Sequence, residues 1–315
     1  MTPGLETEYR GGLEAALKTG WNILSKGGTS LDAVEAAVMS LEDFPLFNAG
    51  RGAVFTHEGK VELDAAIMDG RKLKAGAVAF VKNIRNPIRL ARLVMEQSEH
   101  VLLAGDGANQ FAESLSVRTE PDEYFFTEHR WLQFQEALAA GRIQLDHTAE
   151  TQRRGELSQP VAAPTGISDD PRSQNLAPKS LGTVGAVACD ENGFLAAATS
   201  TGGMTNKKYG RVGDSPIIGA GTYADDVCAV SCTGHGEFFI LGVTAYDVAA
   251  RMKYKGLSLE SAALETIDHL TRIGGEGGLI AVDAQGNVTL PFNSTGMYRG
   301  SIMNDCDPVI DIYGT

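Results

Sequence analysis

Apolar side chains recur at intervals of three and four along several stretches of the chain, as they do on one face of an amphipathic helix. Capping residues mark the ends of some of these stretches. Thr29-Ser30-Leu31-Asp32 resembles a capping box with Asp in place of Glu, and Pro87 suits the first turn of a helix. The pattern predicts helices over about 5–26, 31–41, 87–97, 108–115, 127–140, 238–252 and 257–272.

Between the helices, apolar residues form short runs bounded by glycine and polar turns, which is typical of strands. Two pairs of runs flank the turn sequences His57-Glu58-Gly59-Lys60 and Asp190-Glu191-Asn192-Gly193, and each pair is expected to form a hairpin. Hairpins with helices grouped between them favour layered α+β packing over an alternating parallel sheet. Strands are expected over about 53–56, 61–69, 75–81, 101–104, 183–189, 194–200, 217–220, 227–232, 277–283 and 288–290, and the short one at 101–104 is expected to be buried.

The stretch 147–182 lacks any apolar period and places four prolines among polar residues. This composition predicts a solvated, disordered linker. The linker either spans two parts of the fold or presents its far end for cutting. On the second interpretation the chain divides into residues 1–182, which include the linker, and residues 183–315, and both belong to one structural domain.

The composition is that of a soluble globular protein, with 315 residues of which 43% are hydrophobic and 21% charged. The 40 acidic and 27 basic residues give a net charge of −13, which argues against a nucleic acid or an anionic membrane as partner. No apolar run approaches the roughly 18 residues of a membrane span. The first residues are acidic where a secretory signal would be basic and then apolar, so the protein is expected to be cytoplasmic.

The four cysteines and six histidines show no metal-binding spacing, so free thiols are favoured over disulfides and a transition-metal site is not expected. The glycine-rich loops match neither common phosphate-binding motif. The sequence therefore gives no sign of a redox or organic cofactor.

Gly182-Thr183 marks an abrupt change from the polar linker to an apolar run. A threonine hydroxyl at the start of a buried strand, with a flexible glycine before it, can attack the glycine carbonyl and break the chain there. Thr183 would then carry a free amine that activates its own hydroxyl, which is a known arrangement for a threonine nucleophile. Taken alone, the pair is more simply explained as a strand residue after a boundary glycine.

Longer motifs favour the catalytic interpretation of Gly182-Thr183 over the structural one, because they occur together and in order. They are Gly182-Thr183-Val184-Gly185, Ala198-Thr199-Ser200-Thr201-Gly202-Gly203, Gly210-Arg211-Val212-Gly213-Asp214-Ser215 and Ser231-Cys232-Thr233-Gly234-His235-Gly236-Glu237, with others at 47–55, 62–65, 68–70, 92–96 and 290–293. In this combination the chain resembles the plant-type L-asparaginase and isoaspartyl peptidase family of N-terminal-nucleophile hydrolases. The resemblance covers nearly the whole chain apart from the first residues and the linker.

The resemblance implies a four-layer αββα sandwich of the N-terminal-nucleophile hydrolase type, made from one precursor that cuts itself into two subunits. It also implies that the two subunits stay together and pair as a dimer of αβ heterodimers. Members of the family begin with an apolar strand that ends in a His-Gly-Gly-Ala-Gly-like turn. No such segment precedes the first predicted helix here, so the expected sandwich lacks the family's first strand.

The resemblance also implies roles for individual residues. Thr183 is expected to be the nucleophile, both for cleavage at Gly182-Thr183 and for hydrolysis of the substrate, with Thr201 beside it as a hydrogen-bond partner. The Thr233 hydroxyl and the Gly234 amide are expected to form the oxyanion hole, and Asn48 to line the nucleophile's pocket.

Substrate binding is assigned in the same way to Arg211 for the α-carboxylate and to Asp214 for the α-ammonium, with Gly236 adding backbone contacts. A planar guanidinium grips a carboxylate with two parallel hydrogen bonds, and a carboxylate nearby suits the other end of a zwitterion. Without the resemblance, Arg211 and Asp214 are equally well explained as an exposed ion pair in a loop. His235 is expected only to line the mouth of the pocket.

A structural sodium ion is implied at the loop after the second helix, held by the main-chain carbonyls of Leu41, Glu42, Phe44 and Phe47. Oxygen ligands of this kind suit a hard cation. The expected activity is hydrolysis of β-aspartyl (isoaspartyl) peptides and L-asparagine to L-aspartate through a threonine ester, on a small-molecule or dipeptide substrate. Two alternatives stay open: a glycosylasparaginase of the same superfamily, or an unprocessed, inactive precursor.

Overall fold

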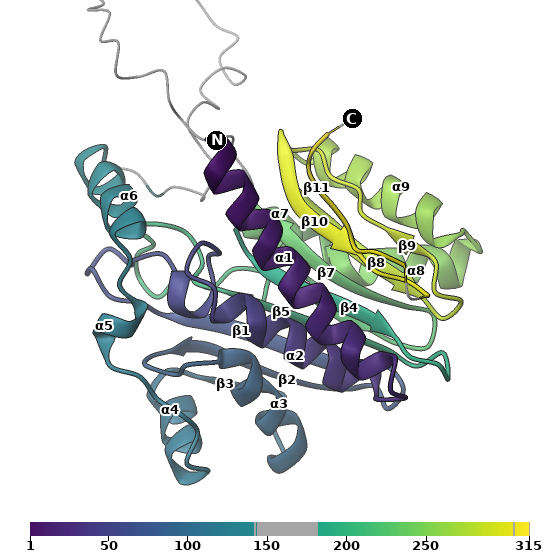
Figure 1. Ribbon diagram of the computed structural model, residues 1–315, viewed down its shortest axis with the longest axis horizontal. Coiled ribbons are helices and arrows are strands. Elements are labelled where there is room, and N and C mark those ends of the chain that lie inside the picture. Colours follow the sequence, from purple (N-terminus) through teal and green to yellow (C-terminus); the bar gives the residue numbers. More distant parts are fainter. Residues whose placement is uncertain (142, 144–181, 305, 315) are drawn as a thin grey trace, which may run out of the picture.

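Two mainly antiparallel sheets form the centre of the fold, and helices lie on their outer faces (Figure 1). The computed structural model describes residues 1–141, 143, 182–304 and 306–314, so nearly all of the predicted linker falls outside the described residues. The larger sheet has the order β3-β2-β1-β5-β4 and the smaller one the order β6-β7-β8-β9, while β10 and β11 pair only with each other. β2 and β3 are parallel neighbours, and the other paired strands are antiparallel.

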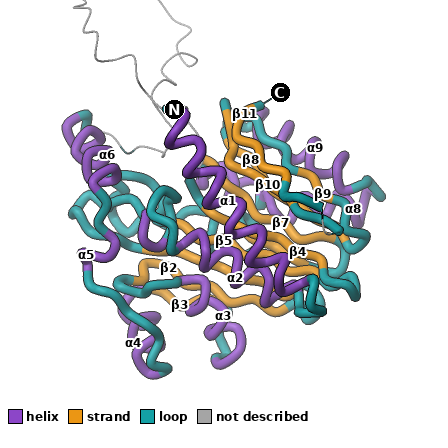
Figure 2. The backbone as a smooth tube through the Cα atoms, viewed as in Figure 1, coloured by secondary structure: helices purple, strands orange, loops and turns teal. Residues whose placement is uncertain are grey.

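The strands that carry these sheets are short. They are β1 (Leu63–Asp69), β2 (Lys74–Val81), β3 (Leu102–Ala104), β4 (Val184–Cys189), β5 (Leu195–Thr201), β6 (Thr222–Ala224), β7 (Cys228–Gly234), β8 (Gly277–Asp283), β9 (Val288–Thr289), β10 (Gly296–Ser301) and β11 (Val309–Tyr313). β4 and β5 of the larger sheet pack against β7 of the smaller one, and Figure 2 shows the two groups of strands stacked behind α1 and α2.

Helices cover the outer face of each sheet. α2 packs on β4 and β5, α3 packs on β1 and β2, and α1 lies across α2 and over β10. On the opposite side α8 packs on β7, and α9 packs on β8. The helices are α1 (Pro3–Leu24), α2 (Ser30–Glu42), α3 (Pro87–Gln97), α4 (Gly105–Ser114), α5 (Asp122–Phe125), α6 (Glu128–Ala139), α7 (Gly236–Gly242), α8 (Thr244–Lys255) and α9 (Leu259–Arg272), with a 3₁₀ turn at Gly50–Gly52.

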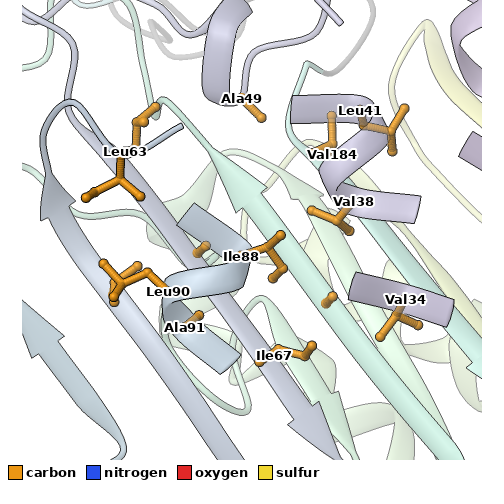
Figure 3. Close-up of a cluster of buried hydrophobic side chains, with 14 of the residues drawn as sticks. Val34, Val38, Leu41, Ala49, Leu63, Ile67, Ile88, Leu90, Ala91 and Val184 are labelled. Carbon is orange, nitrogen blue, oxygen red and sulfur yellow. The ribbon is translucent and has the colours of Figure 1, made fainter. Parts of the chain in front are cut away.

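The largest apolar core lies between the first helices and the larger sheet. Figure 3 shows Val34, Val38 and Leu41 of α2 beside Ile88 and Leu90 of α3, all pointing at the strands. These side chains are at most 5% exposed. Because burial of an aliphatic side chain is worth about 1.5–3 kcal/mol, this contact fixes α2, and the loop that follows α2, against the sheet.

The predicted helix starts are confirmed by their caps. The Thr29 hydroxyl accepts a hydrogen bond from the Asp32 amide (3.1 Å) and donates one to the Asp32 carboxylate (2.7 Å). α3 begins at Pro87, and the Ser258 hydroxyl caps α9 through the Ser261 amide (3.3 Å). The Thr29 and Ser258 caps each satisfy an amide that has no partner inside its helix, whereas Pro87 has no N–H to satisfy.

Two predicted strands are wrong. Residues 53–56 do not form a hairpin arm, because Thr56 instead bridges Lys207 in a parallel pair. Residues 217–220 form a turn in which the Ile217 amide donates to the Asp214 carbonyl (2.9 Å). The strand predicted in this region begins only at Thr222.

The predicted helix 238–252 is two helices, because Val243 adopts a left-handed conformation (φ 48°) between α7 and α8. The Ala245 and Tyr246 amides donate to the carbonyls of Ala220 (3.0 Å) and Gly219 (2.8 Å), so a turn from elsewhere in the chain caps the second helix. β3 was predicted to be buried but is an edge strand, with Leu102 48% exposed. β10 and β11 were not predicted.

An apolar groove separates β4 from β10. α1 and α2 line one side of this groove and β8 and β9 the other, with the backbone of residues 185–189 and 298–304 at its two edges. The groove encloses about 560 Å³. Among the described residues, β4 pairs only with β5 and β10 only with β11, so each has one strand edge without a partner there. Such an edge is a template for pairing with a further strand.

Candidate active site

The start of β4 and the end of β5 bring two threonine hydroxyls together. Thr183 Oγ1 lies 3.0 Å from Thr201 Oγ1, and the Gly203 amide donates to the same Thr201 oxygen (3.0 Å). The antiparallel register, in which Val184 pairs with Ser200, is what places Thr183 beside Thr201. Thr201 is 2% exposed, whereas Thr183 is half-buried. Of these two hydroxyls, Thr183 is the one that a small molecule can reach.

Asn48 connects the loop after α2 to both sides of this hydroxyl pair. Its amide donates to the Gly182 carbonyl (2.9 Å), and its side chain donates to the Gly203 carbonyl (2.7 Å) and accepts from the Val54 amide (3.0 Å). The carbonyl that Thr183 would have to attack is therefore already polarised by a backbone N–H. Asn48 is 2% exposed, and its side-chain nitrogen and oxygen each make a hydrogen bond that holds neighbouring loops together.

Thr233 and Gly234 lie at the end of β7. The Thr233 hydroxyl is buried and has no hydrogen-bond partner among the described residues. A side chain at Gly234 would come within 2.5 Å of the Glu276 carbonyl and 2.6 Å of the Phe239 ring, so only glycine fits there. Because buried hydroxyls are normally paired, the free Thr233 oxygen is suited to a group that is not part of the protein.

Arg211, Asp214 and Gly236 form a second group in contact. A Cβ placed on Gly236 would lie 2.8 Å both from Arg211 Nη2 and from Asp214 Oδ1, so Gly236 sits directly between the cation and the anion. Asp214 is 5% exposed, and its Oδ2 has no partner among the described residues. Burial of Asp214 therefore argues against the interpretation of Arg211 and Asp214 as an exposed ion pair in a loop.

Burial raises the pKa of Asp214 to about 7, although the nearby Arg211 charge and the backbone amide of Asp214 itself pull it down. A carboxyl group with such a pKa is ionised only in part at neutral pH, and an incoming cation would favour its ionised form. The Thr233–Gly236 segment joins this group to the end of β7.

Two charged contacts near these groups were not predicted from the sequence. The Glu237 carboxylate binds the Arg211 guanidinium with two hydrogen bonds, from Nε and Nη2, both 2.9 Å long. Lys207 and Asp64, each at most 1% exposed, lie 4.0 Å apart below the Gly203 turn, and Lys207 Nζ donates to the Glu62 carbonyl (3.2 Å). The partners in each contact are far apart in sequence and form no motif of fixed spacing, so these contacts are found only in the folded structure.

The loop expected to hold sodium is folded by its own backbone. The Leu41 carbonyl accepts from the Phe44 amide (3.2 Å), and the Phe47 carbonyl accepts from the Ala49 amide (2.9 Å). A carbonyl has two lone pairs, so these bonds leave one on each oxygen. Burial raises the pKa of Glu42 to about 8, although hydrogen bonds from Ser200 and the Ile88 amide pull it down, so the neutral form of its side chain is favoured at pH 7.

Within the described part of the chain, no cluster of three or more His, Cys, Asp or Glu side chains has a geometry that fits a metal ion. Across the same residues, no helix combines the length and the apolar character needed to cross a membrane.

Comparison with known proteins places these motifs in one family. The family model Asparaginase_2, described as Asparaginase, matches residues 1–310. An isoaspartyl peptidase of Salmonella typhimurium is 49% identical over 315 residues, which cover 99% of this chain and 93% of that protein. An isoaspartyl peptidase of Escherichia coli is 48% identical (98% and 89% covered), and a probable isoaspartyl peptidase/L-asparaginase 2 of Arabidopsis thaliana is 43% identical (93% and 88%). This chain therefore belongs to the asparaginase family, as its motifs predicted.

Proposed function

We propose that this protein is an autoprocessing amidohydrolase that converts β-aspartyl (isoaspartyl) peptides and L-asparagine to L-aspartate. The observation that carries the proposal is the contact between the Thr183 and Thr201 hydroxyls, because Thr183 is the residue that directly follows Gly182. The names of the relatives supply the substrate class. The chain acts on small molecules or dipeptides, with no nucleic acid as partner, and uses no redox or organic cofactor.

Self-cleavage begins when Thr183 Oγ attacks the Gly182 carbonyl carbon. The Asn48 amide stabilises the negative charge that develops on the Gly182 oxygen, at its present distance of 2.9 Å. The peptide C–N bond breaks, the hydroxyl proton passes to the Thr183 nitrogen, and an ester remains. Water hydrolyses this ester, which leaves a Gly182 carboxylate and a free amine on Thr183.

The freed amine, with a pKa of about 8, is partly neutral at physiological pH and takes the Thr183 hydroxyl proton during attack on the substrate. The Thr233 hydroxyl and the Gly234 amide donate to the oxyanion, and the unpaired state of the buried Thr233 oxygen supports this role. The leaving ammonia or amino acid takes up the proton, and water then releases L-aspartate from the ester. Thr201 keeps the nucleophile in place through its hydrogen bond.

Arg211 binds the substrate α-carboxylate and Asp214 the α-ammonium, with Gly236 leaving room between them. The support for this assignment is the position of Gly236 against both charged groups and the unpartnered Asp214 Oδ2. The opposite charges match the two ends of an amino-acid zwitterion.

The binding of the ammonium group should depend on pH through Asp214. Because burial raises the pKa of Asp214 to about 7, its carboxyl is neutral below that value and charged above it. We expect KM for L-asparagine to fall as pH rises from about 6 to about 8 and then to level off. Steady-state kinetics on the wild type and on Asp214→Asn test this, since the variant should bind weakly with a flat KM profile. A wild-type KM that stays constant over this range would contradict the assignment.

The experiment that tests the function combines mass analysis with product assays. A fresh preparation should contain two fragments, 1–182 and 183–315, and should release ammonia from L-asparagine and an amino acid from an isoaspartyl dipeptide. Release of sugar from asparagine-linked N-acetylglucosamine, without those products, would favour a glycosylasparaginase. Intact chain without activity after incubation would identify an unprocessed precursor.

The finer form of the fold belongs to the same proposal: a four-layer αββα sandwich of the N-terminal-nucleophile hydrolase type, cut into two subunits that stay together. The contacts of β4 and β5 with β7, and the helices on both outer faces, support four layers. We also propose that two such heterodimers pair, which the molar mass from sedimentation equilibrium measures, and that the protein acts in the cytoplasm, which fractionation of cells tests.

The apolar groove between β4 and β10 supports the proposal that this sandwich lacks one strand. α2 packs on β4 and α1 packs on β10, both helices line the groove, and each strand has an unpaired edge among the described residues. The Tyr298 hydroxyl at the groove lies 3.9 Å from Met1 Sδ. A segment attached ahead of Met1 therefore has direct access to the groove.

Fusing an eight-residue strand of alternating apolar side chains and a glycine turn ahead of Met1 should stabilise the protein. The strand would pair with both free edges and bury its side chains, and we expect the Tm to rise by about 3 °C or more. The matched control carries Asp at the alternating apolar positions of the same fusion. Equal melting temperatures for the two fusions would mean that the groove does not hold a strand.

We further propose that the carbonyls of Leu41, Glu42, Phe44 and Phe47 hold a structural sodium ion. All four ligands are oxygens, which suits a hard cation. The buried Arg130 guanidinium donates to the carbonyls of Leu46 (2.9 Å) and Gly52 (2.7 Å). Neither carbonyl belongs to the ligand set, so these bonds do not occupy a proposed sodium ligand. Equal melting temperatures in sodium chloride and choline chloride would argue against the ion.

A further inference from the structure

Glu237 binds Arg211, the arginine proposed to bind the substrate, but the mechanism above gives Glu237 no role. It lies in the first turn of α7, and both its oxygens accept hydrogen bonds from Arg211, at 2.9 Å from Nε and 2.9 Å from Nη2. The Arg211 side chain is 16% exposed, whereas that of Glu237 is 48% exposed. Two parallel charge-assisted bonds of this kind fix the plane of a guanidinium as well as its position.

The glycines beside Arg211 complete this restraint. A Cβ on Gly213 would lie 2.8 Å from Arg211 Nη1, and one on Gly236 would lie 2.8 Å from Nη2. The guanidinium therefore lies close to both glycines, and a side chain at either one would displace it. Glu237 occupies only the edge formed by Nε and Nη2.

The remaining edge of the guanidinium is the one available to a substrate. A guanidinium has five N–H donors, so the edge formed by Nη1 and Nη2 keeps one donor on each nitrogen when Glu237 is bound. Nη1 makes no hydrogen bond within the described part of the chain, and Gly236 and Asp214 lie next to Nη2. A carboxylate bound at this edge would lie beside Asp214, where the ammonium of the same amino acid binds.

We infer that Glu237 is a positioning residue, which holds the Arg211 guanidinium so that its Nη1–Nη2 edge faces the substrate α-carboxylate. This inference rests on the proposed function of Arg211. Any stability gained from this pair does not account for the orientation that two parallel hydrogen bonds impose on the guanidinium. Orientation of a long side chain before binding does explain the bidentate pair, because a free arginine would lose its rotamer freedom when the substrate binds.

His235 lies close to the same carboxylate. Its Nε2 lies 3.6 Å from Glu237 Oε2, and its ring packs edge-on against Phe238 at 5.0 Å. The pKa of Glu237 is lowered on balance, because the hydrogen bond and charge of Arg211 outweigh the opposing effect of burial. The Glu237 carboxylate is therefore ionised at neutral pH and keeps its hold on Arg211 there.

Glu237→Gln tests this inference, because glutamine keeps the shape but loses the charge and one acceptor. The variant should cleave itself as the wild type does, and KM for both substrates should rise about tenfold with kcat within about twofold, the pattern of lost uniform binding. Glu260→Gln is the matched control, since it removes an exposed carboxylate from the first turn of α9 and should change neither constant. A KM that is unchanged or lower in Glu237→Gln would overturn the inference, and a lower KM would mean that Glu237 competes with the substrate for Arg211.

Calorimetric binding of L-aspartate separates this inference from the proposed function. Aspartate carries the same carboxylate and ammonium, so its Kd should rise about tenfold in Glu237→Gln and stay constant in Glu260→Gln. If the wild type binds aspartate but hydrolyses neither substrate, the proposed function fails. The Kd values of the wild type and of Glu237→Gln for aspartate still decide the role of Glu237. Failure of the wild type to bind aspartate would overturn the inference.

Discussion

Thr183→Ala is expected to leave a single uncut chain and to reduce hydrolysis by about a thousandfold or more, because one oxygen is proposed to perform both attacks. The hydroxyl pair of Thr183 and Thr201 would lose its reactive member, while the Thr201 hydroxyl keeps its bond from the Gly203 amide (3.0 Å). Mass analysis of the purified protein and product assays on the same sample measure the two losses together.

Thr183→Ser is the control for this substitution, since it retains the hydroxyl and removes only a methyl group. It should still cut after Gly182, although more slowly, because a serine side chain is less restrained at χ1 than a β-branched one. A Thr183→Ala chain that splits at Gly182 would show that another group performs the attack, and the mechanism would then have to be rebuilt around that group.

The parts of the fold that sequence predicted well are those in which local chemistry decides the structure. The cap of α2 at Thr29, the start of α3 at Pro87 and the hairpin of β4 and β5 each depend on a few neighbouring residues. Their signals are a hydroxyl that caps amides, a ring that fixes φ, and a turn sequence between apolar runs. None of these needs information from a distant segment.

The errors occur where a distant segment determines the local conformation. Val243 interrupts a helical pattern because the first amides of α8 bond to the carbonyls of Gly219 and Ala220. Residues 217–220 look like a strand in sequence, but they form the turn that supplies those carbonyls. Periodicity reports which face of an element is buried and carries no information about which remote backbone will cap it.

In the candidate site, too, only some of the contacts could be predicted from the sequence. Thr183, Thr201 and Asn48 were expected to lie together from motif resemblance. The two threonine hydroxyls are 3.0 Å apart, and Asn48 bonds to the carbonyls of their neighbours Gly182 and Gly203. The bond of Glu237 to Arg211 could not be predicted, because the two residues are 26 positions apart with β6 and β7 between them, and no motif states which acid will meet which base. Pairing of charges across loops is a property of the folded site.

Arg211→Ala is expected to reduce kcat/KM for both substrates by about a thousandfold while self-cleavage continues at the wild-type rate. The two processes should separate because the substrate α-carboxylate needs the guanidinium, whereas the Gly182 carbonyl already has its donor in the Asn48 amide. The substitution also removes the positive charge that lowers the pKa of Asp214, so the Asp214 carboxyl should become still harder to ionise and bind the ammonium less well. Kinetics and mass analysis on one preparation measure both effects.

Arg211→Lys and Lys208→Ala are the two controls that identify the cause of this loss. Lysine restores the charge but cannot offer two parallel donors to a carboxylate, so it should recover only a small part of the activity. Lys208 lies in the same loop, and its removal lowers the positive charge without touching the guanidinium, so activity should stay near that of the wild type. If Arg211→Ala loses self-cleavage to the same degree as turnover, then Arg211 serves the fold of the 202–215 loop, and the α-carboxylate must be bound by another group.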